Sequence, residues 1–186
     1  MKKTKNKMTE ELKMKEERTS GKVLAEIVNT GAYEECSRES HERWMKTKLE
    51  QGWTYGPTRD NVNKKNPFMV DYQQLPEKEL RMNRVTPYAV VNFLRVDYPD
   101  KNLLELKRVL GDLKEGKDQK ELQKLSEYVH SHFIAAQLAI GETAGTRNDM
   151  TVYESLSPET QSWDSEIAKQ VIDFVMRKIK VLEAEK

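Results

Sequence analysis

The chain repeats part of its own pattern when it is shifted by 89 positions. Over residues 41–60, six positions are identical to their counterparts, where about one is expected for unrelated sequences. The identical pairs are His41 and His130, Leu49 and Leu138, Gly52 and Gly141, Thr54 and Thr143, Gly56 and Gly145, and Asp60 and Asp149. Further on, an offset of 81 aligns Tyr72 with Tyr153 and Leu75 with Leu156. The repeat predicts two small pseudo-symmetric units, although helix, glycine and loop patterns also recur by chance in helical proteins.

The repeat divides the 186 residues into four predicted segments. We expect a charged, partly disordered leader at 1–21, a first unit at 22–98, a connecting helix at 99–116 and a second unit at 117–182. Only 37% of the residues are hydrophobic. Two small units plus a charged leader fit this composition better than one thick core.

Helical periodicity dominates both units, which predicts a mainly α fold with short β strands. In the first unit we expect a helix from residue 22, one capped by Ser37 and ended by Gly52, a polar loop over 52–67 and an extended segment over 68–72. Two short helices should then start near Pro76 and Pro87.

The remaining helices are expected in the connecting segment and the second unit. Asp100 is a predicted cap for a helix that Gly111 ends, and apolar spacing predicts a helix over about 117–140 that Gly141 ends. The Ser157–Pro158 pair predicts the start of a last helix.

Charge and composition exclude several classes of protein. The 32 basic and 31 acidic side chains nearly cancel, so we expect no long nucleic acid as a partner. No apolar stretch approaches the roughly 20 residues of a membrane span, which predicts no membrane association. The lone Cys36 and the absence of a secretory signal favour a cytoplasmic protein.

Residues 41–83 resemble the ryanodine receptor repeat, also called the RyR or Ry domain. The matching residues are His41-Glu42-Arg43-Trp44, Gly52-Trp53-Thr54-Tyr55-Gly56-Pro57, Arg59-Asp60, Lys64-Lys65, Pro67, Val70, Tyr72, Leu75-Pro76 and Glu79. The family commonly has His-Pro where this chain has Asn66-Pro67, and in the second copy Glu142 and Ala144 replace the aromatic residues. The second repeat therefore reads as degenerate.

The resemblance implies a mostly helical binding module without catalytic activity. In the calcium-release channels, tandem copies of the repeat look like they form an adenine-nucleotide site in which tryptophans hold the base. Stand-alone versions look like ligand sensors. We therefore expect a non-enzymatic module that binds an adenine-type or signalling nucleotide, with sequestration of that nucleotide as one form of the activity. No cofactor or metal is expected.

The first polar loop carries residue types that suit a nucleotide. Trp53, Tyr55 and Trp44 offer flat rings for a base, Arg59, Lys64 and Lys65 offer positive charge for phosphates, Gly56 allows close backbone approach, and Asp60 can accept from a ribose or amine. His41 and Arg147 complete the candidate ligand-binding set. The alternative is structural: tryptophans in the core, an ion pair between Arg59 and Asp60, and solvated lysines.

Catalytic signals are weak. His130 and His132 are two residues apart on a predicted helix, so they diverge by about 200° and cannot share a metal ion. Cys36 has no histidine partner in the sequence. The main alternative function is a protein-interaction or oligomerisation module, including a homo-oligomer, with its interface on the charged helices at 8–29 and 100–126.

Overall fold

The computed structural model describes residues 19–184, apart from residues 30, 146 and 148. This part of the chain contains six α-helices, two 3-10 turns and one pair of short strands. The elements are α2 (Ser20–Asn29), α3 (Ala32–Glu50), β1 (Thr54–Tyr55), β2 (Lys65–Asn66), η1 (Tyr72–Gln74), α4 (Glu77–Asp97), α5 (Leu103–Glu115), α6 (Gln119–Ala139), η2 (Tyr153–Ser155) and α7 (Pro158–Ala184). The predicted fold class, mainly α with short strands, is confirmed. Most of the predicted leader lies outside the described residues.

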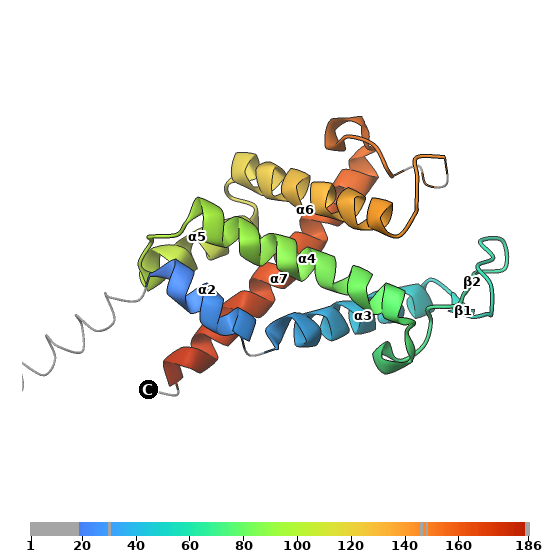
Figure 1. Cartoon of the computed structure of the whole chain (residues 1–186), viewed down its shortest axis with the longest axis horizontal. Coiled ribbons are helices and arrows are strands. Elements are labelled where there is room, and N and C mark those ends of the chain that lie inside the picture. Colours follow the sequence, from blue (N-terminus) through green and yellow to red (C-terminus); the bar gives the residue numbers. More distant parts are fainter. Residues whose placement is uncertain (1–18, 30, 146, 148, 185–186) are drawn as a thin grey trace, which may run out of the picture.

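Two long helices, α4 and α7, run through the middle of the molecule (Figure 1). Helices α3 and α6 lie on opposite sides of α4, α2 and α5 gather at one end, and the loop with β1 and β2 projects at the other. The two strands are parallel and pair Thr54 with Lys65 and Tyr55 with Asn66.

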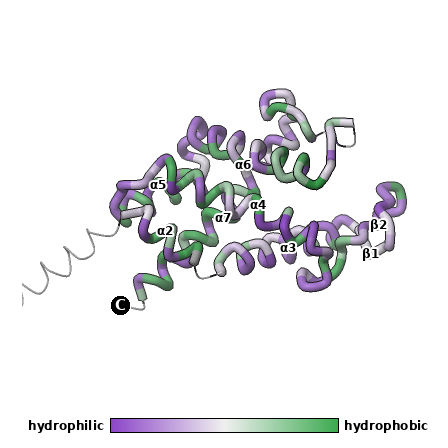
Figure 2. Tube along the Cα trace, in the orientation of Figure 1, coloured by the Kyte–Doolittle hydropathy of each residue, from purple (hydrophilic) through white to green (hydrophobic). Residues whose placement is uncertain are grey.

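The core is shared by both predicted units. Apolar and polar residues are interspersed along the helices (Figure 2). The buried apolar side chains form one cluster that includes Leu24, Leu94, Leu110, Leu125 and Ile172. Because this cluster takes residues from all of the helices α2–α7, the two predicted units share one interior.

Helix α3 begins earlier than the sequence predicted. Gly31 takes a left-handed conformation with φ 71° and precedes the first turn, while Ser37 lies inside the helix. The buried Ser37 hydroxyl donates to the Tyr33 carbonyl one turn back, at 2.6 Å. Ser37 is thus no cap, and its polar group is satisfied within the helix. Gly52 does follow the end of the helix with φ 82°, as predicted.

Two predicted helix boundaries are wrong for the same reason. Pro87 lies inside the single helix α4, where two helices were expected, and Gly111 lies inside α5. In each case buried residues continue on the same face beyond the breaker, such as Leu94 in α4 and Leu113 in α5. Packing of a continuous apolar face outweighs the local preference of proline or glycine.

Helix α5 has clear ends that differ from the predicted ones. Asn102, not Asp100, is its cap: the Asn102 side chain accepts from the Glu105 N–H, and the Glu105 carboxylate accepts from the Asn102 N–H. Gly116 ends the helix with φ 67°. Residues 68–72, expected to be an extended segment, form no strand: a turn and a bend lead into η1, which begins at Tyr72, and the strands lie at 54–55 and 65–66.

Equivalent residues of the predicted repeat make equivalent contacts. His41 Nε2 lies 2.8 Å from the Val70 carbonyl oxygen, and His130 Nε2 lies 2.9 Å from the Thr151 carbonyl oxygen. Each histidine ring also contacts the tyrosine of the following 3-10 turn, with ring centres 5.9 Å apart for Tyr72 and 6.0 Å apart for Tyr153. In both halves, therefore, one histidine joins a long helix to the segment after it by a hydrogen bond to a carbonyl oxygen and a ring contact with a tyrosine.

Candidate functional site

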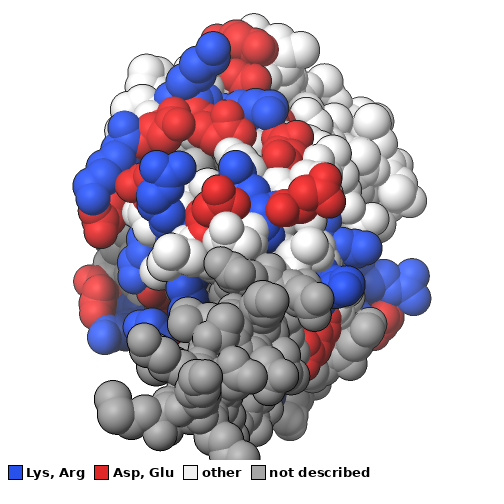
Figure 3. Space-filling view, turned by 90° about the vertical axis from the view of Figure 1, so that its left-hand side faces the viewer, with Lys and Arg blue, Asp and Glu red and all other residues white. Residues whose placement is uncertain are grey.

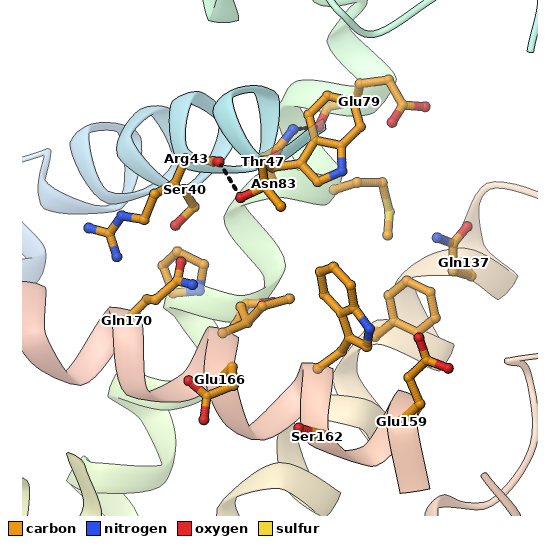
Figure 4. A pocket seen from close by; sticks show the side chains of 17 residues that line it. Ser40, Arg43, Thr47, Glu79, Asn83, Gln137, Glu159, Ser162, Glu166 and Gln170 are labelled. Atoms are coloured by element: carbon orange, nitrogen blue, oxygen red, sulfur yellow. Dashed lines mark hydrogen bonds between the residues drawn. The ribbon is translucent and has the colours of Figure 1, made fainter. Parts of the chain in front are cut away.

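A pocket of about 610 Å³ lies between α3, α4, α6 and α7. Its apolar lining combines aromatic and aliphatic side chains from all four helices: Trp44, Met82, Pro87, Phe133, Trp163 and Ile167. Helices α3 and α7 form opposite walls (Figure 4). This volume is within the usual range for small-molecule sites, which are mostly apolar with a few polar groups.

The two tryptophans of the pocket are held differently. Trp44 on α3 is half-buried and stacks on the buried His41 ring, with centres 5.5 Å apart and planes 28° apart. Trp163 on α7 leaves 46% of its surface exposed. One indole is thus backed by the core, while the other leaves almost half of its surface accessible, which suits the stacking of a flat ring.

Polar side chains are distributed unevenly around the pocket. Arg43 and Gln170 lie toward one end, and Gln137 and Glu159 lie toward the other (Figure 4). Three of the four charged residues in the lining are acidic, with Arg43 as the exception. A polyphosphate deep inside this pocket would therefore meet like charges.

Glu79 is the half-buried acidic residue of the lining. Burial raises the pKa of its carboxyl group, although Lys78 and Arg147 act in the opposite direction. Both of these cations are paired elsewhere: Lys78 lies 3.7 Å from Glu142, and Arg147 lies 2.7 Å from Asp149. Within the described residues, the Glu79 carboxylate accepts no hydrogen bond and forms no ion pair.

Of the ten predicted ligand-binding residues, Trp44 lines the pocket. His41 lies directly behind it, and the guanidinium of Arg147 stacks 5.2 Å from the ring of Phe133, which also lines the pocket. Trp53 lies outside the lining but shares a neighbour with it. The Lys48 ammonium group lies 5.3 Å from the centre of the Trp53 ring and 5.9 Å from the centre of the Trp163 ring, which lines the pocket.

The other predicted residues lie on the projecting loop, outside the pocket lining. The Asp60 carboxylate accepts from the backbone N–H groups of Val62 and Asn63 and from the Asn63 side chain, and the hydrogen bonds from Asn63 lower its pKa. Arg59 donates to Asn61 rather than pairing with Asp60. Asp60 therefore closes the loop, with its acceptors already occupied.

The loop lysines donate to neutral oxygens. Lys64 Nζ donates to the Gln51 carbonyl at 2.8 Å and Lys65 Nζ donates to the Thr54 hydroxyl at 2.7 Å. Neither forms an ion pair with a described residue. Gly56 lies against Lys65, and a Cβ at Gly56 would stand 2.7 Å from the Lys65 Cβ. Gly56 thus permits the close approach of the two strands. Its neighbour Tyr55 leaves 56% of its surface exposed.

The described residues hold no group of three or more His, Cys, Asp or Glu side chains that could bind a metal ion. His130 and His132 contact separate backbone carbonyls, those of Thr151 and Tyr128. Cys36 is buried, which raises its pKa to about 12 and keeps the thiol protonated. No helix in this part of the chain is long and apolar enough to cross a membrane.

Sequence reasoning did not identify Trp163, Phe133 or Glu79 as site residues. One signal was present, because the offset of 89 aligns Trp44 with Phe133, and both line the pocket. Trp163 has no aromatic counterpart at the offset of 81, where residue 82 is Met82. Its place opposite α3 follows only from the packing of α7.

The fold and the pocket together define a small helical module with an aromatic site between its long helices. Residues 18–96 match the family model of the RyR domain, so the chain contains a ryanodine receptor repeat and the predicted family is confirmed. This match covers α2, α3 and all but the last residue of α4. The RyR domain therefore supplies the α3 and α4 walls of the pocket, and residues beyond it supply the α6 and α7 walls. A second, degenerate repeat at 117–182 stays a prediction.

Proposed function

We propose that the protein is a non-enzymatic binding module that holds the base of an adenine-type or signalling nucleotide between Trp44 and Trp163. The observation that carries the proposal is that two tryptophans from different halves of the chain line one pocket of about 610 Å³. Stacking of a base on an aromatic side chain contributes about 1–3 kcal/mol in nucleic-acid complexes. Tight binding without turnover would make sequestration of the nucleotide one form of this function, and the lone, buried Cys36 suits a reducing cytoplasm.

The phosphates of the nucleotide are assigned to the rim of the pocket. Lys48 and Lys64 both contact Gln51, at 3.4 Å through its side chain and at 2.8 Å through its carbonyl oxygen. Neither lysine has an acidic partner within an ion-pair distance among the described residues. Lys48, whose ammonium group lies 5.9 Å from the centre of the Trp163 ring, and Lys64 on the other side of Gln51 would offer an anion site that the acidic interior does not.

Ligand-induced stabilisation tests this proposal. AMP, ADP, ATP, cyclic AMP and ADP-ribose would be screened by thermal shift and by tryptophan fluorescence, since a bound ligand raises the melting temperature. We expect a shift with at least one of them and its loss in Trp163→Ala, whose exposed side chain contributes little to the core. Tyr55→Ala is the matched control because the exposed Tyr55 ring lies on the projecting loop, outside the pocket lining. No shift with any nucleotide, or an unchanged shift in Trp163→Ala, would contradict the proposal.

The alternative is a protein-interaction module, and one observation favours it: Leu104, at the start of α5, is 78% exposed. Two lysines of α5 are nevertheless engaged within the molecule, because they form ion pairs with α7: Lys107 pairs with Glu183 and Lys114 pairs with Asp173. The end of the molecule with α2 and α5 shows acidic and basic side chains interspersed (Figure 3). Light scattering over a concentration series separates the two functions, because an oligomerisation module would change mass and Leu104→Ser would abolish the change.

A further inference from the structure

Glu79 is a carboxylate that forms no ion pair and accepts no hydrogen bond from any described residue, in a site with aromatic walls. It lies in the first turn of α4, is half-buried, and lines the pocket with Trp44. Asn83, one turn on, donates to the Glu79 backbone carbonyl and leaves the carboxylate untouched. The helix therefore presents a polar group that it does not itself satisfy.

The surroundings explain why Glu79 has no partner among the described residues. The nearest cations, Lys78 and Arg147, are engaged by Glu142 and Asp149. A half-buried carboxylate loses hydration, and without a donor in the protein this loss is not compensated. A ligand that supplies an N–H group to Glu79 would restore the missing hydrogen bond.

The rest of the lining fits a donor at this position better than an anion. Glu159 and Gln137 lie toward the same end of the pocket, and Glu159 forms no ion pair with a described residue (Figure 4). Arg43 lies toward the opposite end. A phosphate or carboxylate near Glu79 would be repelled, whereas an amino group would find acceptors.

We infer that Glu79 determines ligand specificity by accepting a hydrogen bond from an exocyclic amino group of the base held between Trp44 and Trp163. The ligand class is then an amino-substituted heteroaromatic ring, such as an aminopurine. This inference rests on the proposed function, because it assumes that a base occupies the pocket.

Calorimetry with a matched pair of nucleotides tests the inference. AMP carries the amino group, and purine riboside 5′-monophosphate lacks it without added bulk. A hydrogen bond to a charged group contributes about 1.5–3 kcal/mol, so we expect AMP to bind the unchanged protein about 10- to 100-fold more tightly. Glu79→Met should bind both nucleotides alike, and Glu79→Gln should discriminate to an intermediate degree.

The control is Glu77→Gln, on the same helix but exposed and paired with Arg81 at 3.0 Å, which should leave both affinities unchanged. Equal affinities of the unchanged protein for the two nucleotides would overturn the inference and leave the proposed function standing. Discrimination that persists in Glu79→Met would do the same. Failure of both nucleotides and of every other base-bearing probe to bind would overturn the inference together with the proposed function.

Discussion

The ammonium group of Lys48 lies 5.9 Å from the centre of the Trp163 ring, although the two residues belong to different halves of the molecule. The same group lies 5.3 Å from Trp53 on the projecting loop. Lys48 therefore contacts both the projecting loop, where most of the ligand-binding residues were predicted, and the pocket between the helices.

Lys48→Met should weaken the binding of phosphorylated ligands selectively. If Lys48 holds a phosphate beside Trp163, its loss removes a charge-assisted hydrogen bond of about 1.5 kcal/mol or more, which is about tenfold in affinity. AMP should lose this factor and adenosine should not. Lys46→Met, an exposed lysine of the same helix, is the control. Calorimetry that finds adenosine and AMP equally affected would place the phosphate elsewhere.

Gly56→Ala should destabilise the loop, whereas Gly145→Ala should not. A Cβ at Gly56 meets the Lys65 Cβ at 2.7 Å, and its repeat counterpart Gly145 has no neighbour nearer than 3.6 Å, the Thr143 hydroxyl oxygen. Overpacking of this kind typically costs about 1–3 kcal/mol. Urea unfolding of both variants checks the difference. Equal stabilities would mean that the β1 and β2 backbones separate without penalty.

Local signals in the sequence predicted what local interactions determine. The apolar spacing of α6 and α7 predicted both helices, and Gly52 and Gly141 take left-handed conformations after α3 and α6. The repeat paired His41 with His130, and both bind a carbonyl oxygen after the following loop. Such contacts follow from residue type and spacing.

The pocket could not be predicted in this way. Trp44 and Trp163 meet because α3 and α7 pack on a shared core, and this packing depends on many buried side chains rather than on a motif. Pro87 shows the same effect within one helix, since burial on α4 overrides its tendency to end a helix. Polar loop residues such as Arg59 and Asp60 looked like ligands because the sequence does not show that Asn61 and Asn63 already occupy them.

Glu79→Gln should make the free protein more stable at neutral pH, and the gain should shrink as the pH falls. Burial raises the pKa of Glu79 in the folded state above its ordinary value of 4.5. The folded state thus binds the proton more tightly than the unfolded state, so the free energy of unfolding rises as the pH falls through this window. Chemical unfolding at several pH values, with Glu77→Gln as reference, measures the effect. A Glu79→Gln protein that is less stable at pH 7 would show that the carboxylate stabilises the fold.

AMP binding should weaken over the same pH window in which Glu79 takes up its proton. A protonated carboxyl group donates one hydrogen bond and loses the charge that strengthens acceptance from an amine. The pH dependence of AMP affinity should therefore flatten in Glu79→Gln. Parallel pH curves for the two proteins would assign the titration to another group.

Replacement of His130 by Phe should destabilise the protein more than replacement of His41 by Phe. Both changes remove a hydrogen bond to a backbone carbonyl, with a cost of about 1–3 kcal/mol when the acceptor is left unsatisfied. His130 has a second role, because its Nδ1 lies 3.1 Å from the Asp164 carboxylate. Burial raises the pKa of Asp164 and His130 opposes that shift, so the loss of His130 leaves a half-buried carboxylate without its partner.

The two histidine variants can be compared by urea unfolding, with Asp164→Asn added to each. In the His130→Phe background, Asp164→Asn should recover part of the lost stability because it removes the unpaired charge. In the His41→Phe background, Asp164→Asn should recover no stability, because His41 contacts the Val70 carbonyl and the Tyr72 ring and no acidic side chain. The gap between the single variants should also narrow at acidic pH, where Asp164 is protonated. If the difference in free energy of unfolding between the single variants is the same at every pH, the two histidines serve only to hydrogen-bond the helix to the segment after it.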